Sequence, residues 1–211
     1  MSTQSQKTRT TFKSVFAWVG WIGFSLCIGI FCITGCSQNT TMNQQSDTFH
    51  KIKSEKLKQT KSVSLSEGET KAALDRFTRF LQGIGSAEFI EKEVANVYAK
   101  EAYLNDTLKS LYNREEIKEH FLKTSETMTT YSVEIEDIAS TDQGHYVRWT
   151  MKFSAPKLAS GKEIESIGMS YVVFDQDGKA VLHQDYWDSV SGMFEHVPVI
   201  GGGIRMIKKR L

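Results

Sequence analysis

Residues 177–188 read DGKAVLHQDYWD, a hairpin turn that runs directly into a strand. The Asp and Gly residues of the turn at 175–178 favour a tight connection, and the side chains after it alternate with a period of two. Successive side chains of a strand point to opposite faces of a sheet. This strand is therefore expected to present His183, Asp185 and Trp187 together on one face.

Upstream of this hairpin, further segments have the same period of two. They lie at 132–139, 145–155 and 163–174, and turn residues such as those at 142–144 separate them. Consecutive strands joined by short turns predict an antiparallel sheet.

The first half of the same region has a helical period instead. Ser66 and Glu69 form a capping box at the start of one helix, a second is predicted at 87–99, and Asn113 caps a third. Helices followed by strands predict an α+β fold, with three N-terminal helices packed on a curved antiparallel sheet. Such a sheet forms a cone, and its mouth is a natural site for a small molecule.

Two stretches carry a family resemblance: VYAKEAYLND at 97–106 and DGKAVLHQDYWD at 177–188. They resemble signature sequences of the nuclear transport factor 2-like superfamily, in its SnoaL-like branch of polyketide cyclases and ketosteroid isomerases. The resemblance covers most of residues 70–190 and implies the cystatin-like α+β barrel of that superfamily. Because the superfamily holds isomerases, cyclases, hydrolases and proteins without chemistry, the resemblance leaves the reaction open.

The resemblance also points to site residues. Asp106 stands where the isomerases keep their general base, and an apolar lid would raise its pKa to suit proton abstraction from carbon. The alternative is a carboxylate that caps a turn through the amide of Thr107. The resemblance implies that the face of His183 and Asp185 is the pocket face. There the two residues can share a proton or orient a water. The alternative is an internal hydrogen-bonded pair that fills the cone.

The pocket is expected to be apolar, because the strand at 145–155 has large apolar side chains at alternate positions. Each of these side chains fits a plain core as well as a ligand site. Together they favour an apolar metabolite or lipid-like molecule as the ligand. The candidate lining residues are Tyr103, Val147, Trp149, Met151, Phe153 and Trp187.

The sequence departs from the ketosteroid isomerases at the donors that stabilise an enolate. The first helix offers Phe77, Phe80 and Gln82 but no tyrosine, and Ser170 stands near the position of an expected aspartic acid. Ketosteroid isomerisation is therefore not expected. A binding module, an acid/base enzyme of cyclase, hydratase or isomerase type, and a dimerising scaffold without chemistry all stay open.

Residues 1–35 predict an export signal. The segment 14–33 is apolar and carries no charge, basic residues precede it, and the tetrapeptide ITGC ends at Cys36. The tetrapeptide resembles a bacterial lipobox, in which the cysteine is acylated, and Ser37 resembles the sorting choice of Gram-negative outer-membrane lipoproteins that face the periplasm. The alternative is an uncleaved transmembrane anchor, since about 20 apolar residues span a bilayer. Both readings place the protein at a membrane.

The chain is expected to have four parts in sequence. They are the signal at 1–35, a flexible polar tether at 36–65, the SnoaL-like domain at 66–192, and an apolar, Gly-rich and then basic extension at 193–211. Two readings of the extension stay open. It contacts lipid headgroups, or it packs Ile204, Ile207 and Leu211 on its own domain.

Composition excludes several classes of function. The 26 basic and 25 acidic residues nearly balance, which argues against a nucleic-acid binder with a broad basic face. All three cysteines lie within the first 36 residues, and the histidines have no ligand spacing, so no disulfide framework, metal or cofactor is expected. The outer face of the sheet is a candidate surface for a homodimer.

Overall fold

The structure of the chain is a computed structural model that describes residues 44–60 and 65–211. The predicted export signal and Cys36 lie outside these residues. Contacts divide the chain into a unit Met1–Ser46 and a unit Asp47–Leu211, and the sheet with its helices belongs to the second. Among the described residues, none of the helices has the length and apolar character needed to cross a bilayer.

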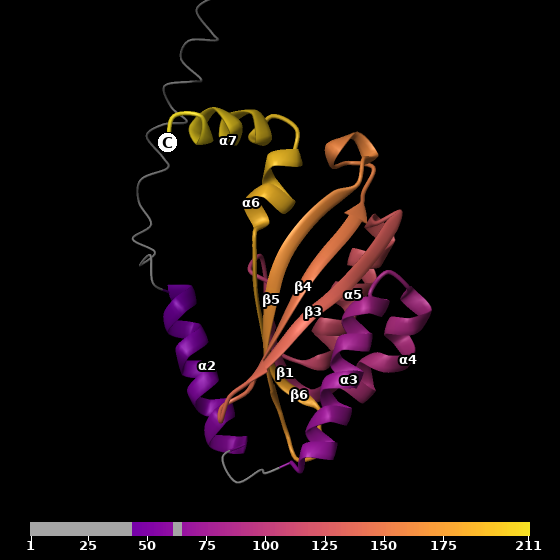
Figure 1. Cartoon of the computed structure of the whole chain (residues 1–211), viewed down its shortest axis with the longest axis vertical. Helices are drawn as coiled ribbons and strands as arrows, with labels where there is room; N and C mark the ends of the chain where they lie inside the picture. The colour runs from indigo at the N-terminus through magenta and orange to yellow at the C-terminus, as the bar shows by residue number, and fades with distance from the viewer. Residues whose placement is uncertain (1–43, 61–64) are drawn as a thin grey trace, which may run out of the picture. The chain divides into compact units, whose positions relative to one another are not determined.

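A curved six-stranded sheet with the order β2-β1-β6-β5-β4-β3 forms the centre of the domain (Figure 1). Its strands are β1 (Tyr98–Asn105), β2 (Ser110–Leu111), β3 (Thr130–Ser140), β4 (His145–Ser154), β5 (Ile164–Phe174) and β6 (Ala180–Trp187). The last four pair with their sequence neighbours in antiparallel fashion, as predicted. β1 pairs with β6 in parallel, and the sheet stays open between β2 and β3. The predicted α+β class is confirmed.

Three helices pack against this sheet, and each begins at a side chain that accepts a hydrogen bond from a backbone amide. They are α3 (Glu67–Gly83), α4 (Ala87–Val97) and α5 (Arg114–Thr127). The caps are Ser66, Ser86 and Asn113, and Ser66 forms the predicted capping box with Glu69.

The main core lies between these helices and the inner face of the sheet. Phe77 and Phe80 of α3 are fully buried, with Ile90 of α4 and Ile117 of α5 beside them. Aromatic rings meet edge to face within it, as in the pair Phe80 and Tyr98, whose centroids are 5.5 Å apart. This core fixes where the helices stand over the sheet.

Helix α2 (Gln44–Thr60) lies in the range where the sequence predicted a flexible tether. Phe49, Ile52 and Leu57 recur at helical spacing and pack on a second cluster, the outer cluster, on the opposite face of the sheet. The members of the outer cluster are Tyr103, Tyr171, Val173 and Leu182. The Lys53 ammonium stands 4.7 Å from the centroid of the Tyr171 ring. Packing on this surface stabilises a helix whose polar composition alone predicted none.

Candidate functional site

A cavity of about 360 Å³ opens between helices α3 and α5 and the inner face of strands β3 to β6. Its walls are mostly aromatic and aliphatic. The apolar lining residues are Leu81, Ile84, Leu108, Phe121, Met128, Val133, Trp149, Met151, Phe153, Ala155, Leu158, Trp187 and Met193. The acidic and histidine side chains among its lining residues fall into two pairs, His183 with Asp185 and His120 with Asp106.

Four of the six residues predicted to line the pocket do so. Trp149, Met151 and Phe153 of β4 and Trp187 of β6 line the cavity. Tyr103 instead belongs to the outer cluster, and the pairing of β1 with β6 shifts register just before it. Val147 is fully buried in the main core and is not among the residues that line the cavity. The predictions for Tyr103 and Val147 were therefore wrong.

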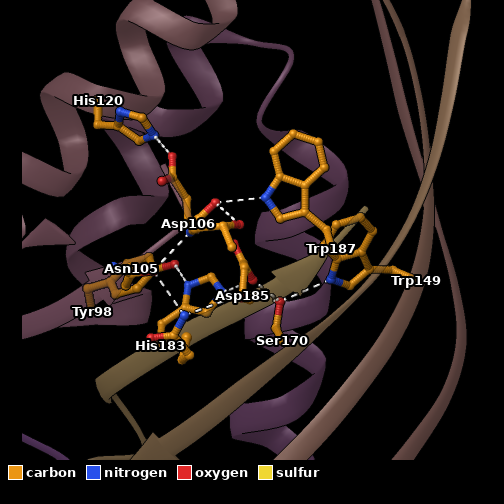
Figure 2. A network of polar contacts seen from close by, with 11 residues as sticks. Tyr98, Asn105, Asp106, His120, Trp149, Ser170, His183, Asp185 and Trp187 are labelled. Carbon is orange, nitrogen blue, oxygen red and sulfur yellow. Dashed lines mark hydrogen bonds and ion pairs between the residues drawn. The ribbon is translucent and has the colours of Figure 1, made fainter. Parts of the chain in front are cut away.

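The first polar pair is built on β6, where residues two apart share a face. Nε2 of His183 lies 2.7 Å from Oδ1 of Asp185 and 3.1 Å from Oγ of Ser170. Ser170 donates its hydroxyl to the same Asp185 oxygen at 2.5 Å and accepts the indole N–H of Trp149 at 3.0 Å (Figure 2). Oδ1 of Asp185 is thus held by one donor from its own strand, β6, and by one from the neighbouring strand β5.

A tyrosine that is buried in the core completes this network. The hydroxyl of Tyr98 lies 2.8 Å from Nδ1 of His183. Burial and the nearby charge of Asp185 raise the pKa of Tyr98 well above its usual value, so the phenol keeps its proton and donates. A carboxylate only accepts hydrogen bonds, which assigns the ring proton of His183 to Nε2 and leaves Nδ1 as the acceptor.

The second oxygen of Asp185, Oδ2, has no hydrogen-bond partner within the described part of the chain, and the side chain is 16% exposed. Asp185 lines the cavity. One carboxylate oxygen is therefore fixed by protein donors, while the other is left for a donor or a proton that enters the cavity.

The second polar pair joins the turn after β1 to helix α5. Nε2 of His120 lies 2.7 Å from Oδ2 of Asp106, and the amides of Leu108 and Lys109 donate to Oδ1 at 2.9 and 2.7 Å. Burial alone would raise the pKa of Asp106. The hydrogen bond and charge of His120 and the two amides outweigh it and hold the pKa below its usual value. The expected raised pKa was therefore wrong, and the turn is capped through Leu108 and Lys109 rather than through Thr107.

Two hydrogen bonds tie the ends of β1 and β6 together and so hold both pairs beside the cavity. The indole of Trp187 donates to the backbone oxygen of Asp106 at 2.7 Å (Figure 2). The amide of Gln184 donates to Oδ1 of Asn105 at 2.9 Å. Asn105 is almost completely buried. Both contacts cross the parallel pairing of β1 with β6, which brings these distant segments side by side.

Sequence reasoning missed His120, Tyr98 and the role of Ser170. The register of the predicted β5–β6 hairpin contained a signal for Ser170, because it pairs directly with Asp185. Tyr98 and His120 gave no comparable signal, since their partners lie on elements that only the tertiary fold brings close. In the part of the chain that the structure describes, no three acidic, His or Cys side chains are grouped to hold a metal ion.

Comparison with known families places the chain in a class. The SnoaL-like domain family matches residues 77–183, about half of the chain. The chain therefore belongs to the SnoaL-like domain family, and the resemblance drawn from its sequence is confirmed at this level. A search of curated proteins finds no match.

Solved structures of low sequence identity have the same fold. A protein from Jannaschia sp. CCS1, described as a SnoaL-like polyketide cyclase, aligns with a TM-score of 0.54 at 10% identity, over 64% of this chain and 97% of that one. TsrD from Streptomyces laurentii aligns with a TM-score of 0.51 at 14% identity, over 64% of this chain and 98% of that one. At these identities the likeness shows the fold alone.

Proposed function

We propose that the domain binds an apolar small molecule or lipid-like ligand in the cavity, with Asp185 as its polar anchor. The observation that carries this proposal is Oδ2 of Asp185, which has no partner among the described residues and lies within an otherwise mostly apolar wall. The cavity volume of about 360 Å³ falls in the range of small-molecule sites, which combine apolar walls with few polar groups.

The anchor also narrows the chemistry of the ligand. The Asp185 carboxylate lines the cavity together with Trp149 and Trp187. It favours the binding of a molecule with a hydroxyl or N–H group at one end, because hydrogen bonds to a charged acceptor are strong. An analogue without that donor leaves the carboxylate oxygen partly desolvated and unpaired, which is costly. The expected ligand is therefore an apolar body with one donor group.

Native mass spectrometry of the full chain in detergent tests this proposal, after incubation with a cell lipid extract and followed by organic extraction of bound material. We expect a discrete adduct that is weakened in Asp185→Asn. The matched control Asp142→Asn changes an exposed carboxylate in the β3–β4 turn and should keep the adduct. A clean apo mass for the wild-type chain would contradict binding and favour a scaffold.

A second candidate function, acid/base catalysis, is supported by the same network. His183 holds Asp185 at 2.7 Å and is itself held by Tyr98, so the free oxygen of the carboxylate is positioned to take a proton from a bound molecule. Once the ligand is known, Asp185→Asn separates the two functions. An enzyme would lose turnover by orders of magnitude while still binding its substrate, whereas a binding module shows no turnover in either form.

We also propose, from the sequence, that the protein is exported and anchored at a membrane through Cys36. The apolar segment 14–33 and the ITGC tetrapeptide support this proposal. The substitution Cys36→Ser should abolish acylation and so shift the mass of the chain and its partition into detergent. An unchanged mass and partition would favour an uncleaved transmembrane anchor.

A further inference from the structure

The C-terminal helix α7 (Ile200–Lys208) begins an apolar stripe that its own domain leaves largely exposed. Ile200, Ile204, Ile207 and Leu211 recur at helical spacing, so they fall on one side of the segment. Ile200 is 54% exposed, Ile207 is 59% exposed and Leu211 is fully exposed. One reading of the sequence packed Ile204, Ile207 and Leu211 on the domain. Ile204 is half-buried, but for Ile207 and Leu211 that reading is wrong.

A neighbouring face of α7 fastens the helix to the segment that follows β6. Gly201 lies so close to the backbone of Glu195 that a Cβ would stand 2.0 Å from its carbonyl oxygen. Arg205 donates to this oxygen at 2.6 Å, while the Lys208 ammonium pairs with the Glu195 carboxylate and lies 3.3 Å from the hydroxyl of Ser191. These contacts hold α7 in place, so its apolar stripe has a fixed direction and does not belong to a loose tail.

This segment is also basic, although the chain as a whole is nearly neutral. Residues 197–211 include four basic residues and no acidic one. Arg205 and Lys208 make the docking contacts above. Lys209 and Arg210 are exposed and have no ion pair with any described residue. A fixed apolar stripe bordered by unpaired cations is the pattern of a helix that lies in an anionic membrane interface.

We propose that α7 binds the surface of an anionic lipid bilayer, with Ile200, Ile207 and Leu211 at the boundary of headgroups and acyl chains. Lys209 and Arg210 contact the anionic headgroups. Charge complementarity favours this occupant over a second copy of the chain, because two α7 segments would bring the unpaired Lys209 and Arg210 of both copies together. This contact is independent of the ligand cavity and is a second membrane contact beside the proposed N-terminal anchor.

Hydrogen exchange of the full chain in lipid nanodiscs tests the proposal. One set of nanodiscs holds phosphatidylcholine with phosphatidylglycerol and the other holds phosphatidylcholine alone, so an N-terminal insertion is common to both. We expect amides at 200–211 to exchange about tenfold more slowly in the anionic nanodiscs, since each cation near an anionic surface contributes to binding. Equal exchange in the two lipids would overturn the proposal.

Two variants and a control identify the cause of any protection. Lys209→Glu with Arg210→Glu, and separately Ile207→Ser with Leu211→Ser, should each abolish the difference between the lipids. The control Lys92→Glu with Lys162→Glu makes the same charge change at exposed positions elsewhere and should keep it. Unchanged exchange in the strands checks the fold. Protection that persists in the charge variant overturns the proposal. Protection that appears in detergent and grows with protein concentration also overturns it, and would show that the stripe contacts a second copy of the chain.

Discussion

The imidazole of His183 and the carboxylate of Asp185 meet at 2.7 Å on the inner face of β6. The side chain of His183 is only 1% exposed, whereas that of Asp185 is 16% exposed at the cavity. His183 therefore acts as a positioning residue that fixes Asp185, and Tyr98 fixes His183 in turn. From core to cavity the order is Tyr98, His183 and Asp185. This order predicts how much the free energy of unfolding falls when Tyr98 or His183 is replaced.

Removal of His183 should cost more stability than removal of the Tyr98 hydroxyl. Tyr98→Phe leaves only Nδ1 of His183 without its donor, and we expect a loss of about 1–2 kcal/mol in the free energy of unfolding. His183→Leu leaves both the Tyr98 hydroxyl and Oδ1 of Asp185 short of a partner, with an expected loss of about 2–4 kcal/mol. Urea unfolding of both variants measures the difference. Equal losses would show that His183 does not link the two groups.

Gly168 of β5 makes room for the Trp149 ring that lines the cavity. A Cβ at Gly168 would lie 2.3 Å from that ring, so Gly168→Ala must displace the indole. We expect a loss of about 1–3 kcal/mol in unfolding free energy and weaker ligand binding, measured by urea unfolding and native mass spectrometry. In the control Gly68→Ala, the added methyl on α3 meets nothing within 4 Å, and the greater helix propensity of alanine should stabilise the domain by up to about 1 kcal/mol. If Gly168→Ala were as stable as the wild type, the Trp149 ring would have to adopt another conformation without a loss of stability.

The sequence predicted those parts of the fold that local chemistry specifies. Side-chain caps such as Ser66 and the change of period after α5 placed the helices and the last four strands, because both signals reside within a few residues. The parallel pairing of β1 with β6 was not predicted, since it joins segments that are far apart in the chain. Helix α2 was missed for a related reason. Its apolar side chains are sparse, and the surface that buries them belongs to other elements.

The candidate site was predictable only along single strands. Alternation on β6 grouped His183 with Asp185, and the structure brings them into contact beside the cavity. The pKa of Asp106 was expected in the wrong direction, because its environment depends on His120 of α5. A partner 14 residues away on another element leaves no local pattern. Periodicity thus gives the face of a residue but not the partner that it meets across the fold.

The stability contributed by Asp106 should depend on pH in a defined direction. Its pKa is lowered in the folded state, so this contribution is fully present above the usual carboxyl pKa of about 4 and is lost as the pH falls through the folded value. We therefore expect Asp106→Asn to destabilise the domain at pH 6, with a difference from wild type that shrinks below about pH 4. Urea unfolding at a series of pH values measures this difference. The exposed control Asp177→Asn should differ little from wild type throughout, and a difference for Asp106→Asn that grows toward low pH would contradict the lowered pKa.

Helix α2 is expected to shield the outer face of the sheet from association. Ile52 and Leu57 are half-buried against the outer cluster, so changing both to Asp should weaken the docking of α2 by about 2–3 kcal/mol. Amide exchange at 47–60 should then become faster by roughly 30-fold or more. The uncovered Tyr171 and Val173 should also favour dimers, which cross-linking in detergent measures.

The control Ser54→Asp with Gln59→Asp adds the same charges at exposed positions of the helix. Exchange at 47–60 that is equally fast in the wild-type chain would show that α2 does not cover this face, and dimers would then be expected without any substitution.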